Sequence, residues 1–488
     1  MNDNDLVFLP AHALADQVRR RRVSCVEVVQ AHLAHIACHN PRLNAVATLD
    51  EAGALAQARA HDETLARSGG DDLGPLVGVP ITVKDALEVA NVRTTFGCRW
   101  TRNHVPATDA PPVARLRAAG AIILGKSNVP EVSFDWQTVS PIFGRTNNPW
   151  DVDKTPGGSS GGAAACVSAG FSALDVGSDG AGSVRVPAHF CGLFALMPTV
   201  HRVPGLGHMK LPRTPHGSRN LLSFGLLARS VEDLRIGLSL VAGPDGRDFD
   251  VPPVPLDTPT NKPLAERRFA FADALPGLPV SAPVRATILR VARELEAAGC
   301  HVEKMTPPGF APDEVLFIWG QIAGAEFGTQ APPHLRPPLR LIFSQLFGPS
   351  AWTTGFTCGL GMNLLRYAQA LSRRDEIAAG WERFLAENDF DAFLCPPAAV
   401  PAFAHRTKGA PVLVDGVKTA YSLAAGAWAT LFNLTEGPAA ILPAGLSHDG
   451  LPIGVQIVGR RWRDAELVSV AEQIARAATG GFQRPPGV

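Results

Sequence analysis

Residues 157–162 read Gly-Gly-Ser-Ser-Gly-Gly, and an alanine-rich helix pattern begins directly after them at Ala163. Glycine lets a backbone approach a bound group closely. The two serines bring hydroxyl groups to the expected start of a helix, where backbone N–H groups and the helix dipole favour negative charge. Taken alone, the run is equally typical of a flexible or tightly turned loop. Its meaning therefore depends on the rest of the chain.

The same run fits the pattern G-x-S-x-G twice, which in α/β hydrolases places a nucleophilic serine on a sharp turn between a strand and a helix. That arrangement needs a strand directly before the serine, and an Asp and a His later in the chain. Residues 148–156 read Asn-Pro-Trp-Asp-Val-Asp-Lys-Thr-Pro, which is not a strand pattern. A hydrolase elbow is therefore disfavoured here.

A second loop of small residues occupies positions 177–185, which read Gly-Ser-Asp-Gly-Ala-Gly-Ser-Val-Arg. Such a loop can aim several backbone N–H groups at one point, and this is the geometry that stabilises a developing oxyanion. By itself the pattern is ambiguous, because small residues also form ordinary turns.

Lysine is scarce in this chain: it occurs 8 times, so arginine accounts for 45 − 8 = 37 of the cationic residues. A lysine beside an apolar run is of interest because it can lose its proton, whereas arginine effectively cannot. Lys84 ends the run Val79-Pro-Ile-Thr-Val, which has the pattern of a buried strand. Burial would lower its pKa from about 10.4 and provide a neutral amine as general base. The alternative is a surface ion pair between Lys84 and Asp85.

Residues 120–127 read Gly-Ala-Ile-Ile-Leu-Gly-Lys-Ser and match the phosphate-loop pattern G-x-x-x-x-G-K-[ST]. A phosphate loop lies between a strand and a helix, but here the middle residues are themselves a strand pattern and Pro130 follows closely. We interpret the match as a strand with a turn, not as a nucleotide site.

Two serine-bearing glycine loops and a strand-end lysine are what a serine hydrolase without a catalytic histidine would use. On these residues the chain resembles the amidase signature family. Residues 157–162 match its Gly-Gly-Ser-Ser-Gly-Gly run, residues 182–185 its Gly-Ser-[IV]-Arg segment, and residues 78–85 its lysine-bearing strand. Ser183 follows Ser159 by 24 residues, as in the family. Residues 41–45, 125–131, 143–149, 432–435 and 450–456 also look like family segments, so the resemblance covers nearly the whole chain.

The resemblance implies a catalytic role for three side chains. Ser183 would be the nucleophile, Ser159 a bridging serine preceded by an unusual cis peptide, and Lys84 the base. The backbone N–H groups of Gly180, Ala181, Gly182 and Ser183 would form the oxyanion hole. The chain departs from many members at Ala181 and at Glu436, where glycine is expected. No metal or organic cofactor is implied, because side chains supply the acid, the base and the nucleophile.

Strand and helix patterns alternate from residue 75, with strands at 76–83 and 121–124 and a helix at 113–119, which favours an α/β fold. The resemblance implies one large domain spanning 1–488, with a central mixed β-sheet flanked by helices on both faces and a signature core at 75–200. Helices are expected over 11–70, 283–298 and 364–387, and strands at 269–274, 301–305, 392–395 and 451–459, followed by a C-terminal helix. Residues 306–363, rich in Pro, Gly, Phe and Trp, are expected to be irregular and to line the substrate pocket.

The composition excludes several classes of protein. The chain has 488 residues, 45 Lys+Arg against 45 Asp+Glu, and 46% hydrophobic residues, which argues against disorder and against binding dominated by nucleic-acid phosphates. The basic run Arg19–Arg22 lies beside a capping box at Ser24 and Glu27 and is interpreted as a solvated helix end. The eight cysteines form no Cys-x-x-Cys pair or zinc pattern. With no leader-like or membrane-spanning segment at its start, the sequence favours a soluble cytoplasmic protein.

The substrate is expected to be a hydrophobic or aromatic amide or carbamate. Asp135, Trp136 and Gln137 lie in a segment that borders the site in the family, and the aromatic region 317–356 is expected to supply apolar walls. Two alternatives remain open. One is the catalytic subunit of an aminoacyl-tRNA amidotransferase, which would need partner subunits. The other is a ligand-binding protein on an inactive amidase scaffold. The sequence leaves the oligomeric state undetermined.

Overall fold

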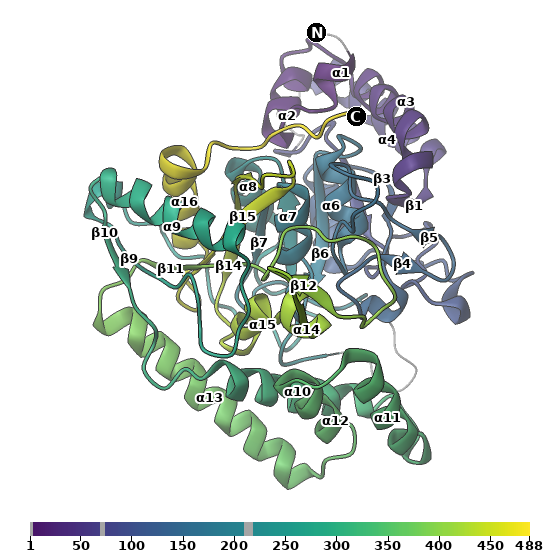
Figure 1. Cartoon of the computed structure of the whole chain (residues 1–488). Coiled ribbons are helices and arrows are strands. Elements are labelled where there is room, and N and C mark those ends of the chain that lie inside the picture. The colour runs from purple at the N-terminus through teal and green to yellow at the C-terminus, as the bar shows by residue number, and fades with distance from the viewer. Residues whose placement is uncertain (1–2, 69–73, 209–217) are drawn as a thin grey trace.

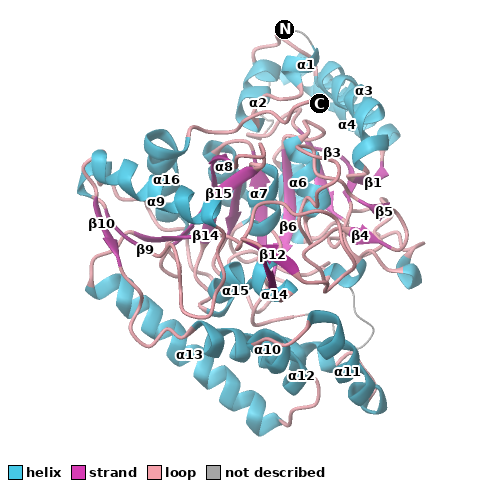
Figure 2. Cartoon of the chain, viewed as in Figure 1, coloured by secondary structure: helices cyan, strands magenta, loops and turns pink. Residues whose placement is uncertain are grey.

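The centre of the molecule is an 11-stranded mixed sheet, drawn in magenta in Figure 2. The computed structural model describes residues 3–68, 74–208 and 218–488. Along the sheet the strands are β1 (Val46–Leu49), β3 (Ile122–Ser127), β2 (Pro80–Lys84), β6 (Leu174–Asp179), β8 (Ser223–Ala228), β7 (Phe194–Met197), β14 (Ala439–Leu446), β15 (Pro452–Val458), β11 (Ala392–Cys395), β9 (Arg268–Phe271) and β10 (His301–Lys304). Two short hairpins, β4 (Val139–Ser140) with β5 (Gly144–Arg145) and β12 (Val412–Val414) with β13 (Val417–Thr419), lie outside it.

Side chains alternate between the two faces of this sheet. On β8, Leu226 packs in the cluster that contains Leu234 and Leu238 of α8 (Val231–Val241), whereas Leu227 packs on the opposite side. That opposite side holds the apolar residues of α6 (Gly161–Ser168) and α7 (Arg185–Cys191). Because successive residues of a strand point to opposite faces, helices cover the sheet on both sides. The expected α/β architecture is thereby confirmed.

The strand β2 is parallel to both of its neighbours, β3 and β6, and every one of its residues is buried. Strands inside a parallel sheet are covered on both faces, which is why the run Ile81–Val83 is apolar or β-branched throughout. The predicted strand at 76–83 begins later, at Pro80, because Gly78 takes a left-handed conformation (φ +72°) that a strand cannot continue. Lys84 is consequently the last residue of the strand.

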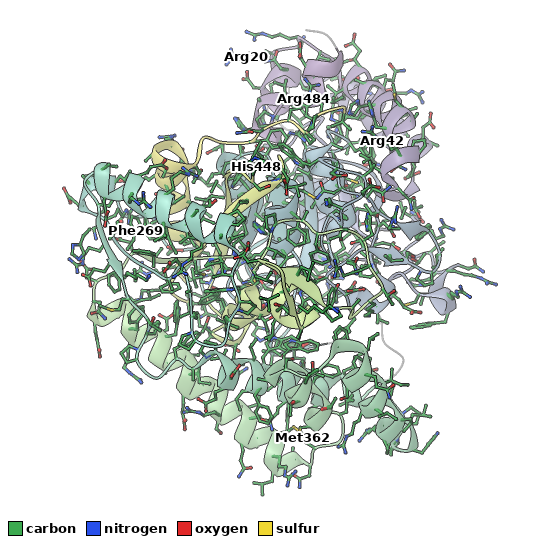
Figure 3. The ribbon with its side chains drawn as sticks, in the orientation of Figure 1. Arg20, Arg42, Phe269, Met362, His448 and Arg484 are labelled. Atoms are coloured by element: carbon green, nitrogen blue, oxygen red, sulfur yellow. The ribbon has the colours of Figure 1, made fainter. Side chains whose placement is uncertain are left out.

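The N-terminal segment, residues 3–68, is helical as predicted, with one strand inserted. Its helices are α1 (Asp3–Leu6), α2 (Ala11–Arg19), α3 (Cys25–Leu43) and α4 (Glu51–Ser68), and β1 separates the last two. Residues 69–70 of the predicted helical region lie outside the described residues. Ser24 and Glu27 form the predicted capping box of α3. Arg19–Arg22 are exposed, and Figure 3 shows Arg20 at the edge of the molecule, so the basic run is a solvated helix end.

The remaining predicted elements are close to the observed ones. The predicted helices correspond to α5 (Pro111–Ala118), α9 (Ala282–Ala297), α13 (Leu364–Glu387) and α16 (Asp464–Ile474), whereas α14 (Tyr421–Ala425) and α15 (Ala427–Leu434) were not predicted. The phosphate-loop match lies on β3, as interpreted, and its lysine, Lys126, is fully buried 3.7 Å from Asp85. Within the three described ranges, no helix has the length and apolar character needed to cross a bilayer.

Residues 306–363 are not irregular, and that prediction is wrong. They form α10 (Pro312–Gly328), α11 (Arg336–Phe347) and α12 (Ala351–Gly359), which lie with α13 below the sheet in Figure 1. Pro312 stands in the first turn of α10, and Pro337 and Pro338 stand in that of α11, where proline is tolerated. The glycines lie where the helices touch: a Cβ on Gly324 would be 2.1 Å from Phe356 O, and one on Gly355 would be 2.1 Å from Phe317 O. At these contacts glycine permits close helix packing, whereas Gly348, with φ +70°, ends α11.

We predict that Asp464→Ala lowers the free energy of unfolding by about 3–5 kcal/mol. Asp464 is buried at the start of α16 and accepts hydrogen bonds from the Thr199 N–H (2.7 Å) and from Arg202 Nε (3.0 Å). Its removal leaves the buried Arg202 guanidinium without its carboxylate. Denaturant unfolding checks the prediction. The exposed Asp449→Ala is the control and should change stability by less than about 0.5 kcal/mol.

Candidate active site

The ammonium group of Lys84 meets two serines at the carboxyl end of β2. Lys84 Nζ lies 2.7 Å from Ser159 Oγ, 3.0 Å from Ser178 Oγ and 3.2 Å from the Ser178 carbonyl oxygen. Ser178 belongs to the neighbouring strand β6, so adjacent parallel strands deliver both groups to the same edge of the sheet. The structure therefore brings together two of the three predicted catalytic side chains, Lys84 and Ser159.

Burial lowers the pKa of Lys84 from 10.5 to about 7, an effect that the charges of Asp179 and Asp175 partly oppose. The side chain is fully buried, and desolvation disfavours its charged form. The alternative of a surface pair between Lys84 and Asp85 is wrong, because Asp85 is buried beside Lys126. An amine with this pKa exists in both protonation states near neutral pH, as a general base requires.

Ser159 is held by the glycine run at 157–162, immediately before α6. The Gly158–Ser159 peptide bond is cis, as the family resemblance implies. A Cβ on Gly158 would lie 2.5 Å from Asp135 O, so only glycine fits at this approach. The next residue links the two serine loops, because the Ser160 N–H donates to the Ser183 carbonyl at 3.1 Å.

The loop that carries Ser183 is anchored by the Asp179 carboxylate. Asp179 accepts hydrogen bonds from the N–H groups of Gly182 (2.7 Å) and Val184 (3.0 Å), and Arg185 Nη2 lies 2.9 Å from it. Burial raises the pKa of Asp179, but the ion pair and the hydrogen bonds outweigh burial and hold that pKa at about 2. The carboxylate therefore stays charged and fixes the turn. At Gly182, φ is +88° and a Cβ would lie 2.5 Å from the Ala429 Cβ.

The predicted oxyanion donors are not equivalent in the structure. The Gly182 N–H is taken by Asp179, whereas the N–H groups of Gly180, Ala181 and Ser183 have no acceptor within residues 3–68, 74–208 and 218–488. Ala181, which stands where many members of the family have glycine, still offers a backbone N–H group.

Ser183 is half-buried at the junction of two cavities. The larger, of about 660 Å³, also contains Ser159 and Ser178 in its wall and is otherwise mostly apolar. Its apolar walls include Phe134, Leu221, Trp319, Phe327, Leu339 and Phe356. The smaller, of about 40 Å³, is lined by Trp136, Trp319, Phe347 and Trp352 together with Asp135. Residues of 306–363 thus line both cavities, mostly from helices, with Gln330, Ala331 and Pro332 contributing to the larger one from the turn between α10 and α11.

The three residues predicted to bind substrate are not placed alike. Asp135 and Trp136 line the smaller cavity. Gln137 is buried and forms two hydrogen bonds with the backbone of Arg406, from Nε2 to O at 3.1 Å and from the Arg406 N–H to Oε1 at 3.0 Å. The structure therefore uses Gln137 to hold a neighbouring segment. Burial raises the pKa of Asp135, although nearby Lys408 opposes this, and Asp135 accepts a hydrogen bond from Tyr421 OH at 2.5 Å.

Two residues of the site were not predicted from the sequence, Ser178 and His208, whereas Trp319 belongs to the aromatic region 317–356 that was expected to line the pocket. His208 Nε2 lies 3.0 Å from Ser178 Oγ, and burial lowers the pKa of His208 to about 3, so the imidazole is neutral. A neutral imidazole nitrogen can accept the Ser178 hydroxyl proton, which leaves the Ser178 oxygen free to accept from Lys84. Ser178 stands in the quoted glycine loop, but no pattern in the sequence marks His208 or indicates that Trp319 bonds to the Gly180 carbonyl.

The departure at Glu436 has a local explanation. Its φ is +59°, a left-handed conformation that glycine adopts without strain. The Glu436 carboxylate lies 2.7 Å from Arg374 and 3.2 Å from Arg461, and its carbonyl accepts a hydrogen bond from the Val200 N–H. Glu436 therefore bridges two cationic segments outside the site.

The described part of the chain holds no group of three or more His, Cys, Asp or Glu residues arranged for a metal ion. The chemical resources of the site are an amine of lowered pKa, two serine hydroxyls and backbone N–H groups. Such a set can move a proton from a hydroxyl to the amine and stabilise negative charge.

Comparison with known proteins places these features in a wider group. The family described as Amidase matches residues 27–468. The A subunit of glutamyl-tRNA(Gln) amidotransferase from Moorella thermoacetica is 32% identical, over 99% of this chain and 99% of its own. Indoleacetamide hydrolase of Bradyrhizobium diazoefficiens is also 32% identical, over 95% of this chain and 85% of its own. Among solved structures, that of 6-aminohexanoate cyclic dimer hydrolase with its substrate matches with a TM-score of 0.79 and 27% identity, covering 98% of this chain and 99% of the other.

We predict that the Lys84 amine titrates with a pKa near 7. With only 8 lysines in the chain, the side-chain signals of ¹³C-labelled lysine can be followed by NMR across a pH titration. Burial also lowers the pKa of Lys126, to about 8, and that of Lys408, so three signals should titrate early, that of Lys84 first. Lys84→Met assigns the signal. A Lys84 amine that stayed charged to pH 10 would contradict the prediction.

Proposed function

This chain belongs to the amidase family and is an amide hydrolase, and we propose that it cleaves its substrate through an acyl-enzyme formed on Ser183. Ser159 and Lys84 form the proton relay in this proposal. The observation that carries it is the 2.7 Å hydrogen bond between Lys84 Nζ and Ser159 Oγ, at the wall of the cavity that Ser183 also lines.

The proposed reaction begins with two proton transfers. Neutral Lys84 takes the hydroxyl proton of Ser159, and Ser159 takes that of Ser183. The Ser183 oxygen then bonds to the carbonyl carbon of the substrate. As the carbon–nitrogen bond breaks, the relay returns a proton to the leaving nitrogen. Water attacks the acyl-enzyme next, and the acid is released while both serines regain their protons.

Negative charge on the carbonyl oxygen needs fixed donors. The N–H groups of Gly180, Ala181 and Ser183 are the donors that this proposal assigns, since the Gly182 N–H is bonded to Asp179. Loss of a single donor from an oxyanion hole typically costs about 3–4 kcal/mol of transition-state stabilisation. The loop therefore supplies as much of the catalysis as the relay does.

The proposed substrate is a hydrophobic or aromatic small amide or carbamate. The large cavity is walled mainly by aromatic and aliphatic side chains, and apolar walls favour ligands that leave water at little cost. Indoleacetamide hydrolase, one of the relatives, carries an aromatic substrate in its name. The eight cysteines are all unpaired, and we propose the reducing cytoplasm as the compartment.

The main alternative is the A subunit of an amidotransferase, because several relatives of 29–32% identity carry that name. In that role the chain is proposed to act with partner chains, whereas the hydrolase proposal expects the isolated chain to turn over simple amides. An inactive ligand-binding scaffold is a second alternative, and formation of an acyl-enzyme would exclude it.

We predict that Ser183→Ala and Lys84→Met each lower kcat/KM for amide hydrolysis by about 10³-fold or more, because the relay members act as a unit. In the wild type, kcat/KM should rise as pH increases through about 7, since the working form of Lys84 is neutral. Steady-state rates from pH 5 to 9 check both points.

Ser160→Ala is the matched control for these variants, because Ser160 is the adjacent buried serine of the same run and should retain most activity. Near-native activity of Ser183→Ala would contradict the assignment of the nucleophile. Labelling of Ser160 in place of Ser183 by a serine-directed reagent would favour the hydrolase-elbow interpretation.

We predict that aryl and long-chain alkyl amides give kcat/KM values about 10²-fold or more above those of small charged amides, because burying apolar area contributes about 25 cal/mol per Å². A panel of aliphatic, aryl and cyclic amides and carbamates, with Ser183→Ala as blank, measures this preference. A panel in which only small charged amides turned over would contradict the assigned substrate class.

A further inference from the structure

We propose that Trp319 and Trp136 are positioning residues of the oxyanion loop, each holding one of its peptide groups through an indole N–H. Trp319 Nε1 donates to the Gly180 carbonyl at 2.9 Å, and Trp136 Nε1 donates to the Ala181 carbonyl at 2.8 Å. This inference rests on the proposed function, in which the loop stabilises the oxyanion formed on Ser183.

The planarity of the peptide group connects these bonds to the oxyanion. In a trans peptide, the carbonyl of one residue and the N–H of the next point in opposite directions. Fixing the Gly180 carbonyl therefore fixes the Ala181 N–H. Fixing the Ala181 carbonyl fixes the Gly182 N–H, which donates to Asp179.

The two carbonyls that follow are held by other elements. The Gly182 carbonyl accepts from the Val186 N–H at 2.7 Å, and the Ser183 carbonyl accepts from the Ser160 N–H at 3.1 Å. The four carbonyls of the loop are thus all occupied, two of them by tryptophans. Among the described residues, no acceptor takes the N–H groups of Ala181 and Ser183. The backbone N–H groups of Ala181 and Ser183 stay available because the carbonyl groups of the loop are all hydrogen-bonded to other parts of the chain.

The two indoles are also part of the cavity walls. Trp136 and Trp319 are each 4% exposed and line the smaller cavity, and Trp319 lines the larger one as well. Indole is suited to this position because it combines a large apolar face with a single donor and no acceptor. Trp136 stands near β4 and Trp319 on α10, so the loop is braced from two segments far apart in the chain.

Ordinary core packing is the competing explanation, since buried indoles usually find a hydrogen-bond partner. Not every buried indole of this chain follows that rule: Trp428 donates to the Pro279 carbonyl at 2.9 Å, but Trp352 and Trp381 are at most 2% exposed, and the indole nitrogen of each has no partner in the described residues. Trp352 even stacks on Trp319, with ring centroids 5.4 Å apart and planes inclined by 20°. The indole bonds to the loop are therefore a specific feature and not a general requirement of burial in this chain.

The same contacts make the loop sensitive to what fills the cavity. A substrate that packs against the face of Trp319 restrains the side chain that orients the Ala181 N–H. Interactions that act only in the transition state raise kcat, whereas uniform binding lowers KM alone. The proposal therefore assigns Trp319 an effect on kcat, in addition to its contact with the substrate.

The test replaces Trp319 in the full-length enzyme with 3-benzothienylalanine, which keeps the shape of indole but carries sulfur in place of the N–H. We expect kcat for the best amide of the panel to fall by about 10-fold while KM changes less than about twofold. The same replacement at Trp381, whose indole nitrogen has no partner in the described residues and which lines neither cavity, is the matched control and should leave kcat unchanged. Equal kcat values for wild type and the Trp319 variant would overturn the proposal.

A second readout separates positioning from a structural role. A trifluoromethyl ketone analogue of the substrate forms an adduct on Ser183 that carries an oxyanion, whereas the corresponding uncharged alcohol does not. We expect the Trp319 variant to bind the ketone about 10-fold more weakly and the alcohol as tightly as the wild type does. A parallel loss for both ligands would indicate a structural role and overturn the inference.

The two proposals fail in different ways. If the proposed function is wrong, the wild type forms no Ser183 adduct and Ser183→Ala keeps its activity. If only the role of Trp319 is wrong, the wild type forms the adduct, Ser183→Ala is inactive, and the benzothienyl variant matches the wild type. Trp136→Phe extends the test to the second indole and should lower ketone affinity in the same direction.

Discussion

The burial of one amine is the constraint around which the site is organised. Lys84 is the last residue of a strand covered on both faces, and its charged form has lost its hydration without gaining an adjacent carboxylate. Its partners are two hydroxyls and a carbonyl, none of which carries the negative charge that would retain the ammonium form. This choice of partners, combined with desolvation, keeps the pKa of the group within reach of neutral pH. A carboxylate in place of Ser178 would restore the charge and remove the base.

A second constraint concerns the orientation of the peptide groups in the loop that carries Ser183. Charged and hydrogen-bonding groups surround the Ser183 loop on the side away from the cavity, with Asp179 and Arg185 behind it and tryptophans at its rim. Preorganised donors are effective because they need no rearrangement when charge develops. Every carbonyl of the loop is hydrogen-bonded, and the N–H groups of Ala181 and Ser183, which have no acceptor among the described residues, are the donors in the proposed mechanism. The hydrogen bonds made by the loop carbonyls thus explain why two of the loop N–H groups are available.

The catalytic segments could be predicted from the sequence because each is local. The run at 157–162, the loop at 177–185 and the apolar strand before Lys84 carry their chemistry within a few residues, and the strand pattern correctly indicated burial. The indole of Trp319 lies 139 residues from Gly180, and His208 lies 30 residues from Ser178, so neither contact leaves a local pattern. The helices of 306–363 were missed for another reason. Glycine disfavours an isolated helix, but here close contact between helices outweighs that preference. Gly320, Gly324 and Gly328 are spaced four residues apart, and this spacing, which places them on one face of a helix, is the sequence pattern that indicates the contact.

The close glycine contact between α10 and α12 affects how the lining of the cavity can change through substitution. Where α10 crosses α12, backbone touches backbone, so the separation of the two helices is set by the main chain and not by the side chains beside it. Residues on the cavity side of these helices can then be exchanged without moving the wall itself. The helix spacing therefore stays constant while the side chains that line the cavity change. One fold can acquire new substrate preferences through single substitutions without displacing the residues proposed to carry out hydrolysis.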